Sequence, residues 1–218
     1  MVVFDDELRN LKANVLKLSS MVETAIRNSV RSLVERNSGL AREVIKNDHQ
    51  INALEVSLDE ECIRLIALRQ PKAGDLRFIT TVMKITTDLE RIGDLAEDIS
   101  ERAIELNEEP PLKPYIDIPR MAEIAEGMLK DALDALIKKD VTLARKVIER
   151  DDEVDSLNLQ VFNELLFFMI QDPTNVSRAT RITYVSKYLE RIADHATNIA
   201  EMVIYMVEGK IVRHTTNP

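Results

Sequence analysis

The sequence has no tryptophan, 4% aromatic residues, five glycines and seven prolines among its 218 residues. So few aromatic and turn-forming residues argue against a sheet, whose strands need a turn at each end. One cysteine, Cys62, is present, so an internal disulfide is excluded. Its place in a helical pattern is typical of a buried thiol that packs as a small hydrophobe. These absences favour an all-α protein.

Long hydrophobic runs are also missing. The longest, Leu165 to Ile170, has six residues, whereas a helix needs about 20 to cross a bilayer. The first four residues are apolar and are followed directly by acids, whereas an export signal has a basic region and then an apolar core. We therefore expect a cytoplasmic protein without a transmembrane segment. A formal net charge of -9 repels phosphate backbones and disfavours nucleic acid as a partner.

Apolar residues recur every three or four positions through six long segments, the pattern of helices in a bundle. The prolines at 110, 111 and 114 predict an extended connector between two units, and Gly209 is positioned to end the last helix. We predict bundles at residues 1–109 and 119–209, a connector at 110–118 and a tail at 210–218. The predicted helices run from Asp5 or Asp6 to about Asn37, Leu40 to Arg69, Asp75 to Asn107, Asp117 or Ile118 to about Lys139, Val141 to Gln171, and from after Pro173 to Glu208.

The second half of the chain repeats the first. The segment Leu89 to Glu101 matches Leu189 to Glu201 at eight of thirteen positions, and both copies keep the order Glu-Arg-Ile-x-Asp. A second pair, Leu40 to Asp48 and Leu143 to Asp151, matches at an offset of 103. Two matches at nearly one period predict a tandem duplication of an antiparallel three-helix bundle, because short turns make sequential helices neighbours. End-to-end and side-by-side packing of the two bundles both remain open.

Each copy of the repeat places two acids four residues apart, which puts both carboxylates on one face of a helix. Like charges at this spacing destabilise an isolated helix by about 0.2–0.5 kcal/mol per pair, so we expect something to offset the repulsion. The acids are Glu90 and Asp94, extended by Asp98 and Glu101, in the first copy and Glu190 and Asp194 in the second.

The preceding helix of each predicted hairpin brings further oxygen atoms to the same height, if the turns lie near residues 72 and 174. Carboxylates and amides without cysteine suit hard or borderline cations and exclude a structural zinc site. The pattern predicts two matching metal sites, with Mn, Mg, Ca, iron or a non-structural Zn ion as candidates. The residues brought opposite the acids are Asp48, Asn52 and Glu55 in the first hairpin and Asp151, Asp155 and Asn158 in the second.

Two interpretations of the acids stay open, because exposed helices also carry such residues as a solvated face. Duplication and the acids on the opposing helices favour cation binding. His195 has no counterpart in the first copy, where Leu95 stands, which favours a surface or packing role over ligation. The additional candidate ligands are Glu101, Glu201, Asn52, Asn198 and His195.

Three segments carry a family resemblance: Leu89 to Asp94, Tyr188 to Glu201, and the turn Arg69-Gln70-Pro71 followed by Asp75-Leu76-Arg77. They are similar to the paired signature of the PhoU family of phosphate-uptake regulators, and the similarity covers nearly the whole chain. The resemblance implies two three-helix bundles, often in a homodimer, whose Glu/Asp-x-x-x-Asp motifs hold metal ions, in some members multinuclear iron.

The same resemblance implies negative regulation of phosphate uptake and of the phosphate-starvation response. The implied partners are a phosphate transporter of the ABC type and a sensor histidine kinase, which would bring the protein to the inner face of the membrane. Two departures predict that the sites differ in affinity or metal count: Asn198 stands where the first copy has Asp98, and Asn52 stands where the second has Asp155.

We expect no enzymatic activity. A carboxylate-bridged di-metal oxidase of the ferritin-like kind needs two Glu-x-x-His motifs, and no histidine of the chain has glutamate three positions before it. We find neither a nucleophile beside a base nor a glycine-rich phosphate loop. The remaining alternative is a structural helical adaptor that binds no metal.

Overall fold

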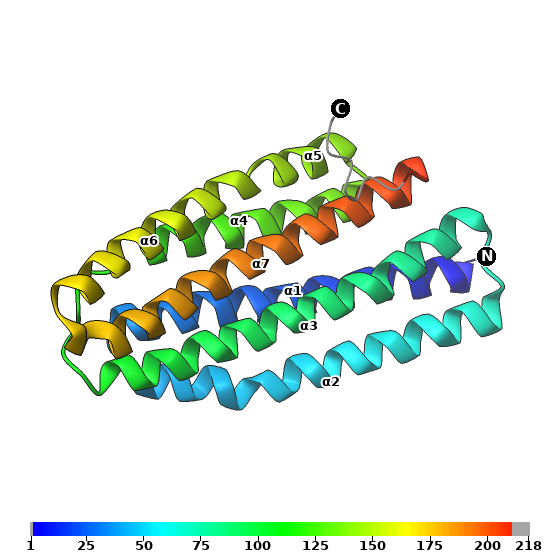
Figure 1. Cartoon of the computed structure of the whole chain (residues 1–218). Helices are drawn as coiled ribbons and strands as arrows, with labels where there is room; N and C mark the ends of the chain where they lie inside the picture. Colours follow the sequence, from blue (N-terminus) through cyan, green and yellow to red (C-terminus); the bar gives the residue numbers. More distant parts are fainter. Residues whose placement is uncertain (1, 211–218) are drawn as a thin grey trace.

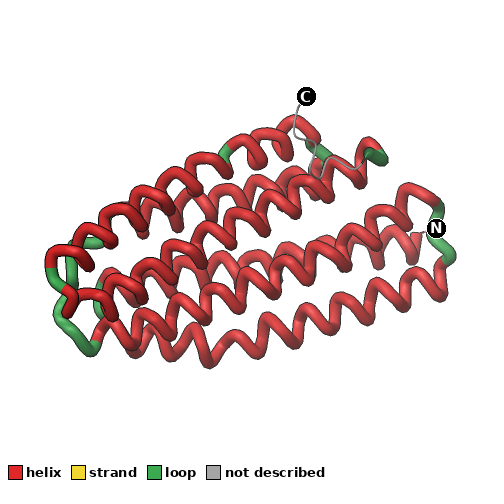
Figure 2. Tube along the Cα trace, viewed as in Figure 1, coloured by secondary structure: helices red, strands yellow, loops and turns green. Residues whose placement is uncertain are grey.

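The computed structural model describes residues 2–210, and within them every regular element is a helix, so the all-α prediction is confirmed (Figures 1 and 2). The helices at residues 141–149 and 151–171 lie along one line, so the chain forms six long rods (Figure 1). The predicted tail lies outside the described residues from 211 onward. The elements are α1 (Val2–Val34), α2 (Ser38–Arg69), α3 (Ala73–Asn107), α4 (Asp117–Lys138), α5 (Val141–Glu149), α6 (Asp151–Gln171), the 3-10 turn η1 (Pro173–Asn175) and α7 (Val176–Glu208).

The turn after the first helix of each bundle is built twice in the same way. Arg36 and Lys139 adopt the left-handed conformation, with φ of 55° and 56°, and so end α1 and α4. The next residues, Asn37 and Asp140, each accept a hydrogen bond at 3.0 Å from the backbone N–H three residues on and thereby cap α2 and α5. This shared turn has the same offset of 103 as the repeat in the sequence.

Four predicted helices have different bounds in the structure. The first begins at Val2, ahead of the predicted aspartates, and ends at Val34, because Arg36 already has positive φ. The predicted helix from Val141 to Gln171 is wrong at Arg150, where the N–H bonds to the carbonyl of Val147, three residues back, at 3.1 Å. This tighter turn separates α5 from α6.

Helices α2 and α3 each begin two residues before the predicted Leu40 and Asp75, at Ser38 and Ala73. The remaining predicted helix ends are confirmed. Gly209 closes α7 with φ of 71°, and its N–H donates to the carbonyl of Tyr205 at 2.8 Å. Asp172 ends α6, and its side chain accepts the N–H of Thr174 at 2.9 Å, so η1 starts the chain again toward α7. Within residues 2–210, none of the helices has the length and the continuous apolar character that crossing a bilayer requires.

The two bundles lie side by side along their full length, with α3 antiparallel to α7 and α1 packed on α4 (Figure 1). One continuous hydrophobic core runs through both, and Leu89 and Leu189 are fully buried in it. At one end Arg181 of α7 pairs with Glu105 and Glu109, at 2.8 Å each. The connector and the duplicated helices therefore form a single packed unit.

Candidate metal centre

The first acidic cluster lies between α2 and α3 and consists of Asp48, Asn52, Glu90, Asp94 and Glu97. Asp48 is 7% exposed and accepts a hydrogen bond from the Asn52 amide at 2.8 Å. Gly93 allows this close approach of α2 to α3, because a Cβ there would meet Asp48 Oδ1 at 3.3 Å and two carbons of Ile51 at 3.2 Å.

Burial and repulsion between carboxylates raise the pKa values of the acids in this cluster. Burial raises the pKa of Asp48, and the nearby Asp94 raises it further, while the hydrogen bond from Asn52 opposes the rise. Burial and then Asp94 raise the pKa of Glu90, and burial and then Asp48 raise the pKa of Glu97. The acids on the two helices therefore share one electrostatic environment.

The second acidic cluster occupies the equivalent place between α6 and α7 and consists of Asp151, Asp155, Glu190 and Asp194. Thr197, seven residues after Glu190, is on the same face of α7 and is counted with this cluster. Burial, with Asp194 next, raises the pKa of Asp151 to about 6. Burial, with Glu190 next, raises the pKa of Asp155 and of Asp194. Besides burial and Asp94, Glu55 of α2 also raises the pKa of Glu90 in the first cluster, whereas the equivalent residue of the second bundle is the neutral Asn158.

Buried oxygen atoms without a hydrogen-bond partner occur in both clusters. Among residues 2–210 they include Asp48 Oδ1 and Asn52 Oδ1 in the first cluster, and Glu190 Oε2 and Thr197 Oγ1 in the second. Buried polar atoms are normally paired, because an unmade hydrogen bond costs about 1–3 kcal/mol. These oxygens have the chemistry that a hard cation needs, although no three Asp, Glu, His or Cys side chains of the described part converge tightly enough for a common ion.

The structure brings together eight of the sequence-predicted ligands in these two clusters and places the others elsewhere. His195 contacts Asp88 of α3 at 2.7 Å, and Asn198 donates to the same carboxylate at 3.5 Å. Both side chains therefore point toward the partner bundle, and the predicted packing role of His195 matches this place. The eight are Asp48, Asn52, Glu90, Asp94, Asp151, Asp155, Glu190 and Asp194.

The remaining predicted residues lie at the edges of the clusters. Burial, followed by Glu101, raises the pKa of Asp98, while Arg191 of α7 lowers it, so Asp98 faces the other bundle. Glu101 is exposed and pairs with Arg102 at 3.2 Å, and Glu201 is half-buried on α7. Asn158 already accepts a hydrogen bond from Ser186 at 2.9 Å, so its amide oxygen is occupied.

Sequence reasoning missed Glu97. The acidic stripe was continued from Asp94 to Asp98, but on an α-helix the position seven residues after Glu90 stays within about 20° of its direction, and the position eight residues after departs by about 80°. Glu97 and Thr197 are these seventh positions. A helical projection of the repeat carries the signal that would have found them.

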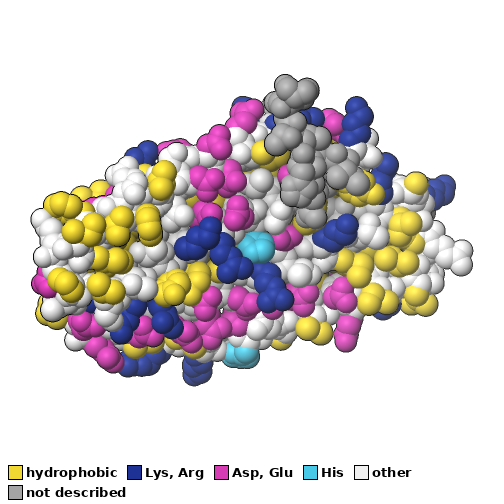
Figure 3. Space-filling model, in the orientation of Figure 1, with side chains coloured by type: hydrophobic (Ala, Val, Ile, Leu, Met, Phe, Trp, Pro, Cys, Tyr) yellow, Lys and Arg dark blue, Asp and Glu magenta, His cyan; other side chains and the backbone are white. Residues whose placement is uncertain are grey.

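Figure 3 shows both acidic areas on one face of the molecule, over the middle of α6 and α7 and along α3 and α2, with lysine and arginine side chains between them. The positive charges separate two negative areas of similar composition. A cation or a cationic partner that approaches this face meets two acidic centres.

Comparison with known proteins agrees with this duplicated arrangement. The model of the PhoU domain matches the chain twice, at residues 15–103 and 118–203. The phosphate-specific transport system accessory protein PhoU homolog of Aquifex aeolicus is 50% identical over 208 residues, which cover 95% of this chain and 94% of that protein. One match corresponds to α1–α3 and the other to α4–α7.

Solved structures show the same fold. The crystal structure of PhoU from Pseudomonas aeruginosa has a TM-score of 0.91 at 40% identity and covers 95% of this chain and 100% of that one. The phosphate transport system regulatory protein PhoU from Streptococcus pneumoniae has a TM-score of 0.88 at 28% identity, with coverage of 96% and 99%. Sequence and structure thus confirm the resemblance, and the chain belongs to the PhoU family.

Proposed function

We propose that this protein regulates phosphate uptake as an accessory of a phosphate transport system, and that it acts as a metal-binding adaptor without enzymatic activity. The names of its relatives, which describe accessory and regulatory proteins of phosphate transport, support the first part. The duplicated acidic clusters support the second part. A purely structural bundle would give no reason to gather carboxylates on two facing helices twice, with one of them, Asp48, buried.

The observation that carries the metal proposal is the set of unpaired buried oxygens in both clusters. A multivalent cation would supply their missing partner and offset the repulsion that raises the pKa values of Asp48 and Asp151. Binding requires rotation of the half-exposed carboxylates toward a common point. The ligands would come from Asp48, Asn52, Glu90, Asp94 and Glu97 in the first bundle and from Asp151, Asp155, Glu190 and Asp194 in the second.

Oxygen ligands suit iron, manganese, magnesium or calcium, and family resemblance favours iron, in one or more ions. A bound cation would also convert a surface that repels anions into one that attracts them, because its open coordination positions accept a phosphate or a partner's carboxylate. The metal would therefore serve as a docking point. The adaptor role follows from this chemistry.

The proposed partners are the phosphate ABC transporter and a sensor histidine kinase, which the protein would join, as a homodimer, at the cytoplasmic side of the membrane. Its proposed effect is negative: uptake and the starvation response fall when phosphate is plentiful. These partners rest on the family resemblance.

Deletion and complementation test the proposal. We expect loss of the gene to raise phosphate uptake and to activate the starvation response in high phosphate, and the wild-type gene to restore both. A gene with Glu90→Gln, Asp94→Asn, Glu190→Gln and Asp194→Asn should fail to restore them. Unchanged uptake and response after deletion would reject the regulatory function, whereas full complementation by the variant would reject only the role of metal.

A further inference from the structure

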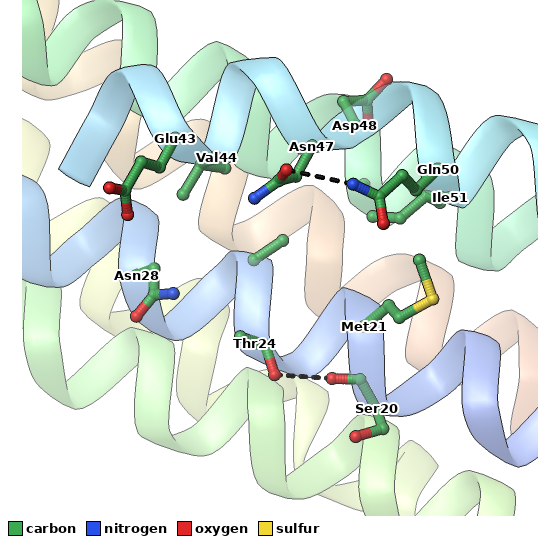
Figure 4. Close-up of a pocket in the computed structure, with 12 residues that line it drawn as sticks. Ser20, Met21, Thr24, Asn28, Glu43, Val44, Asn47, Asp48, Gln50 and Ile51 are labelled. Carbon is green, nitrogen blue, oxygen red and sulfur yellow. Dashed lines mark hydrogen bonds between the residues drawn. The ribbon is translucent and has the colours of Figure 1, made fainter. Parts of the chain in front are cut away.

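A groove of about 290 Å³ runs between α1 and α2 of the first bundle (Figure 4). Thr24 and Asn28 of α1 face Asn47 of α2 across it, and the Glu43 carboxylate of α2 points toward α1, while that of Asp48 points away from α1 (Figure 4). As in most pockets that bind small molecules, much of the wall is apolar, here Met21, Ala25, Val44 and Ile51, and a few hydroxyl, amide and carboxylate oxygens are placed among them.

In the second bundle the equivalent space holds a side chain of the protein itself. At the offset of 103, Thr24, Asn28 and Asn47 correspond to Gly127, Asp131 and Arg150. The Arg150 guanidinium lies against Gly127, where a Cβ would meet Nη2 at 3.0 Å, and Nη1 donates to Asp131 Oδ2 at 2.8 Å. All three positions differ together between the two copies.

The open groove presents acceptors to whatever enters it. The Thr24 hydroxyl donates its proton to the carbonyl of Ser20 at 2.7 Å, so its oxygen lone pairs remain as acceptors. The Asn47 amide oxygen accepts one hydrogen bond from Gln50 at 3.1 Å and has a second lone pair. Asp48 Oδ1 is unpaired as well, but it is buried toward Gly93 of α3 and is not exposed to the groove. Such a wall selects a ligand that is rich in donors and positively charged.

We propose that this groove binds an arginine side chain of a partner protein, in the place that Arg150 fills within the second bundle. A planar guanidinium carries five N–H donors in a fixed fork and can reach oxygens on both walls, whereas a lysine ammonium is a compact charge. Thr24 stands where Arg150 touches Gly127, so the incoming group lies farther from the α1 backbone and contacts the hydroxyl. The first copy thus uses for recognition a site that the second copy closes internally.

Titration of the full chain with Nα-acetyl-arginine methylamide, followed by NMR in the presence of EDTA, tests this proposal. We expect saturable amide shifts at Thr24, Asn28 and Asn47 with a dissociation constant of about 1–10 mM, as for a single side chain. The dissociation constant of the corresponding lysine compound should be higher by a factor of about three or more. Because EDTA keeps the acidic clusters free of metal, the result does not depend on the metal proposal.

Two matched exchanges between the copies complete the test. Thr24→Gly with Asn28→Asp and Asn47→Arg closes the first groove and should abolish the shifts, and Asn47→Arg alone serves if the triple variant does not fold. Gly127→Thr with Asp131→Asn and Arg150→Asn opens the second groove and should create a second responding site. Absence of saturable shifts in the wild type, equal binding of the lysine compound, or unchanged shifts in the closed variant would overturn the proposal.

Discussion

In the first bundle the neutral member of the acidic cluster is Asn52 on α2, and in the second it is Thr197 on α7. The residues at the equivalent positions of the other bundle, Asp155 and Glu97, are both acids. This neutral side chain has therefore changed helices, and Glu55 adds a further carboxylate beside Glu90 in the first bundle, where the second has Asn158. In both clusters the oxygen of that neutral side chain is buried without a partner.

This comparison separates what the two copies share from what they do not. The left-handed turns, the buried core and the facing carboxylates recur in both halves, whereas the groove beside the cluster is open in one and closed by Arg150 in the other. The shared features support a common task for the two clusters. The differing groove supports a task that belongs to the first bundle alone.

The shared core gives the largest expected effect. Leu89→Ala and Leu189→Ala each remove a fully buried side chain and should lower the free energy of unfolding by about 2–5 kcal/mol. Because one core joins both bundles, we expect a single cooperative transition in guanidinium chloride for both variants. The exposed Leu68→Ala is the control and should change stability by less than about 0.5 kcal/mol. Two separate transitions, each affected by one variant only, would show that the bundles unfold independently.

The second acidic cluster should make stability depend on pH in chelator-treated protein. The pKa of Asp151 is raised to about 6 from 3.8, so the folded state holds this proton more tightly than the unfolded state. Its contribution to stability is therefore full below about pH 4 and is lost as the pH rises through about 6. Asp151→Asn should flatten the fall of Tm between these values.

The two clusters are expected to differ in this respect. Asp48→Asn should flatten the pH dependence less than Asp151→Asn, because the hydrogen bond from Asn52 opposes the rise of the Asp48 pKa. Glu60→Gln, at an exposed position outside both clusters, is the control. Identical pH profiles of Tm for wild type and Asp151→Asn would contradict the raised pKa.

Loss of the contact between the bundles at His195 should lower the free energy of unfolding by less than the core substitutions do. His195→Leu installs the residue of the first copy and removes the 2.7 Å contact with Asp88, which should cost about 1 kcal/mol. His49→Leu, at an exposed position, is the control for loss of a histidine. Equal stabilities of the two variants would mean that the contact contributes nothing.

Gly93 and Ala193 occupy equivalent positions, and Gly93→Ala gives the smallest expected change in the free energy of unfolding. Gly93→Ala gains about 1 kcal/mol of helix propensity, but its Cβ would meet Ile51 at 3.2 Å, so we expect a net change within about 0.5 kcal/mol. Ala193→Gly has no such compensation and should cost about 1 kcal/mol. If thermal unfolding shows that Gly93→Ala gains the full ~1 kcal/mol of stability, Ile51 on α2 moves away from the added methyl group at no energetic cost.

Much of the fold and of the site was predictable from local patterns. Helical periodicity located the six rods, and the hairpin turns placed Asp48 and Asn52 opposite Glu90 and Asp94. Those arguments need only the rise and the period of a helix and the position of a turn.

The rest depends on contacts between distant segments. The sequence pattern does not show that His195 and Asn198 turn toward Asp88, because this follows from side-by-side packing of the bundles. The break at Arg150 was missed for a similar reason: its guanidinium is held by Asp131 of another helix. Glu97 differs, since a helical projection of the sequence would have found it.

The metal content of the purified protein tests the central claim most directly. Four proteins, all purified without chelator, would be compared by elemental analysis and by Tm with and without added metal. They are the wild type, Glu90→Gln with Asp94→Asn, Glu190→Gln with Asp194→Asn, and the charge-matched control Glu60→Gln with Glu108→Gln. We predict that each cluster variant loses the metal of its own bundle and part of the metal-induced rise in Tm, because binding stabilises the native state by mass action, and that the control loses neither. Wild-type metal content and stabilisation in both cluster variants would contradict the account and would make the two acidic clusters solvated helix faces.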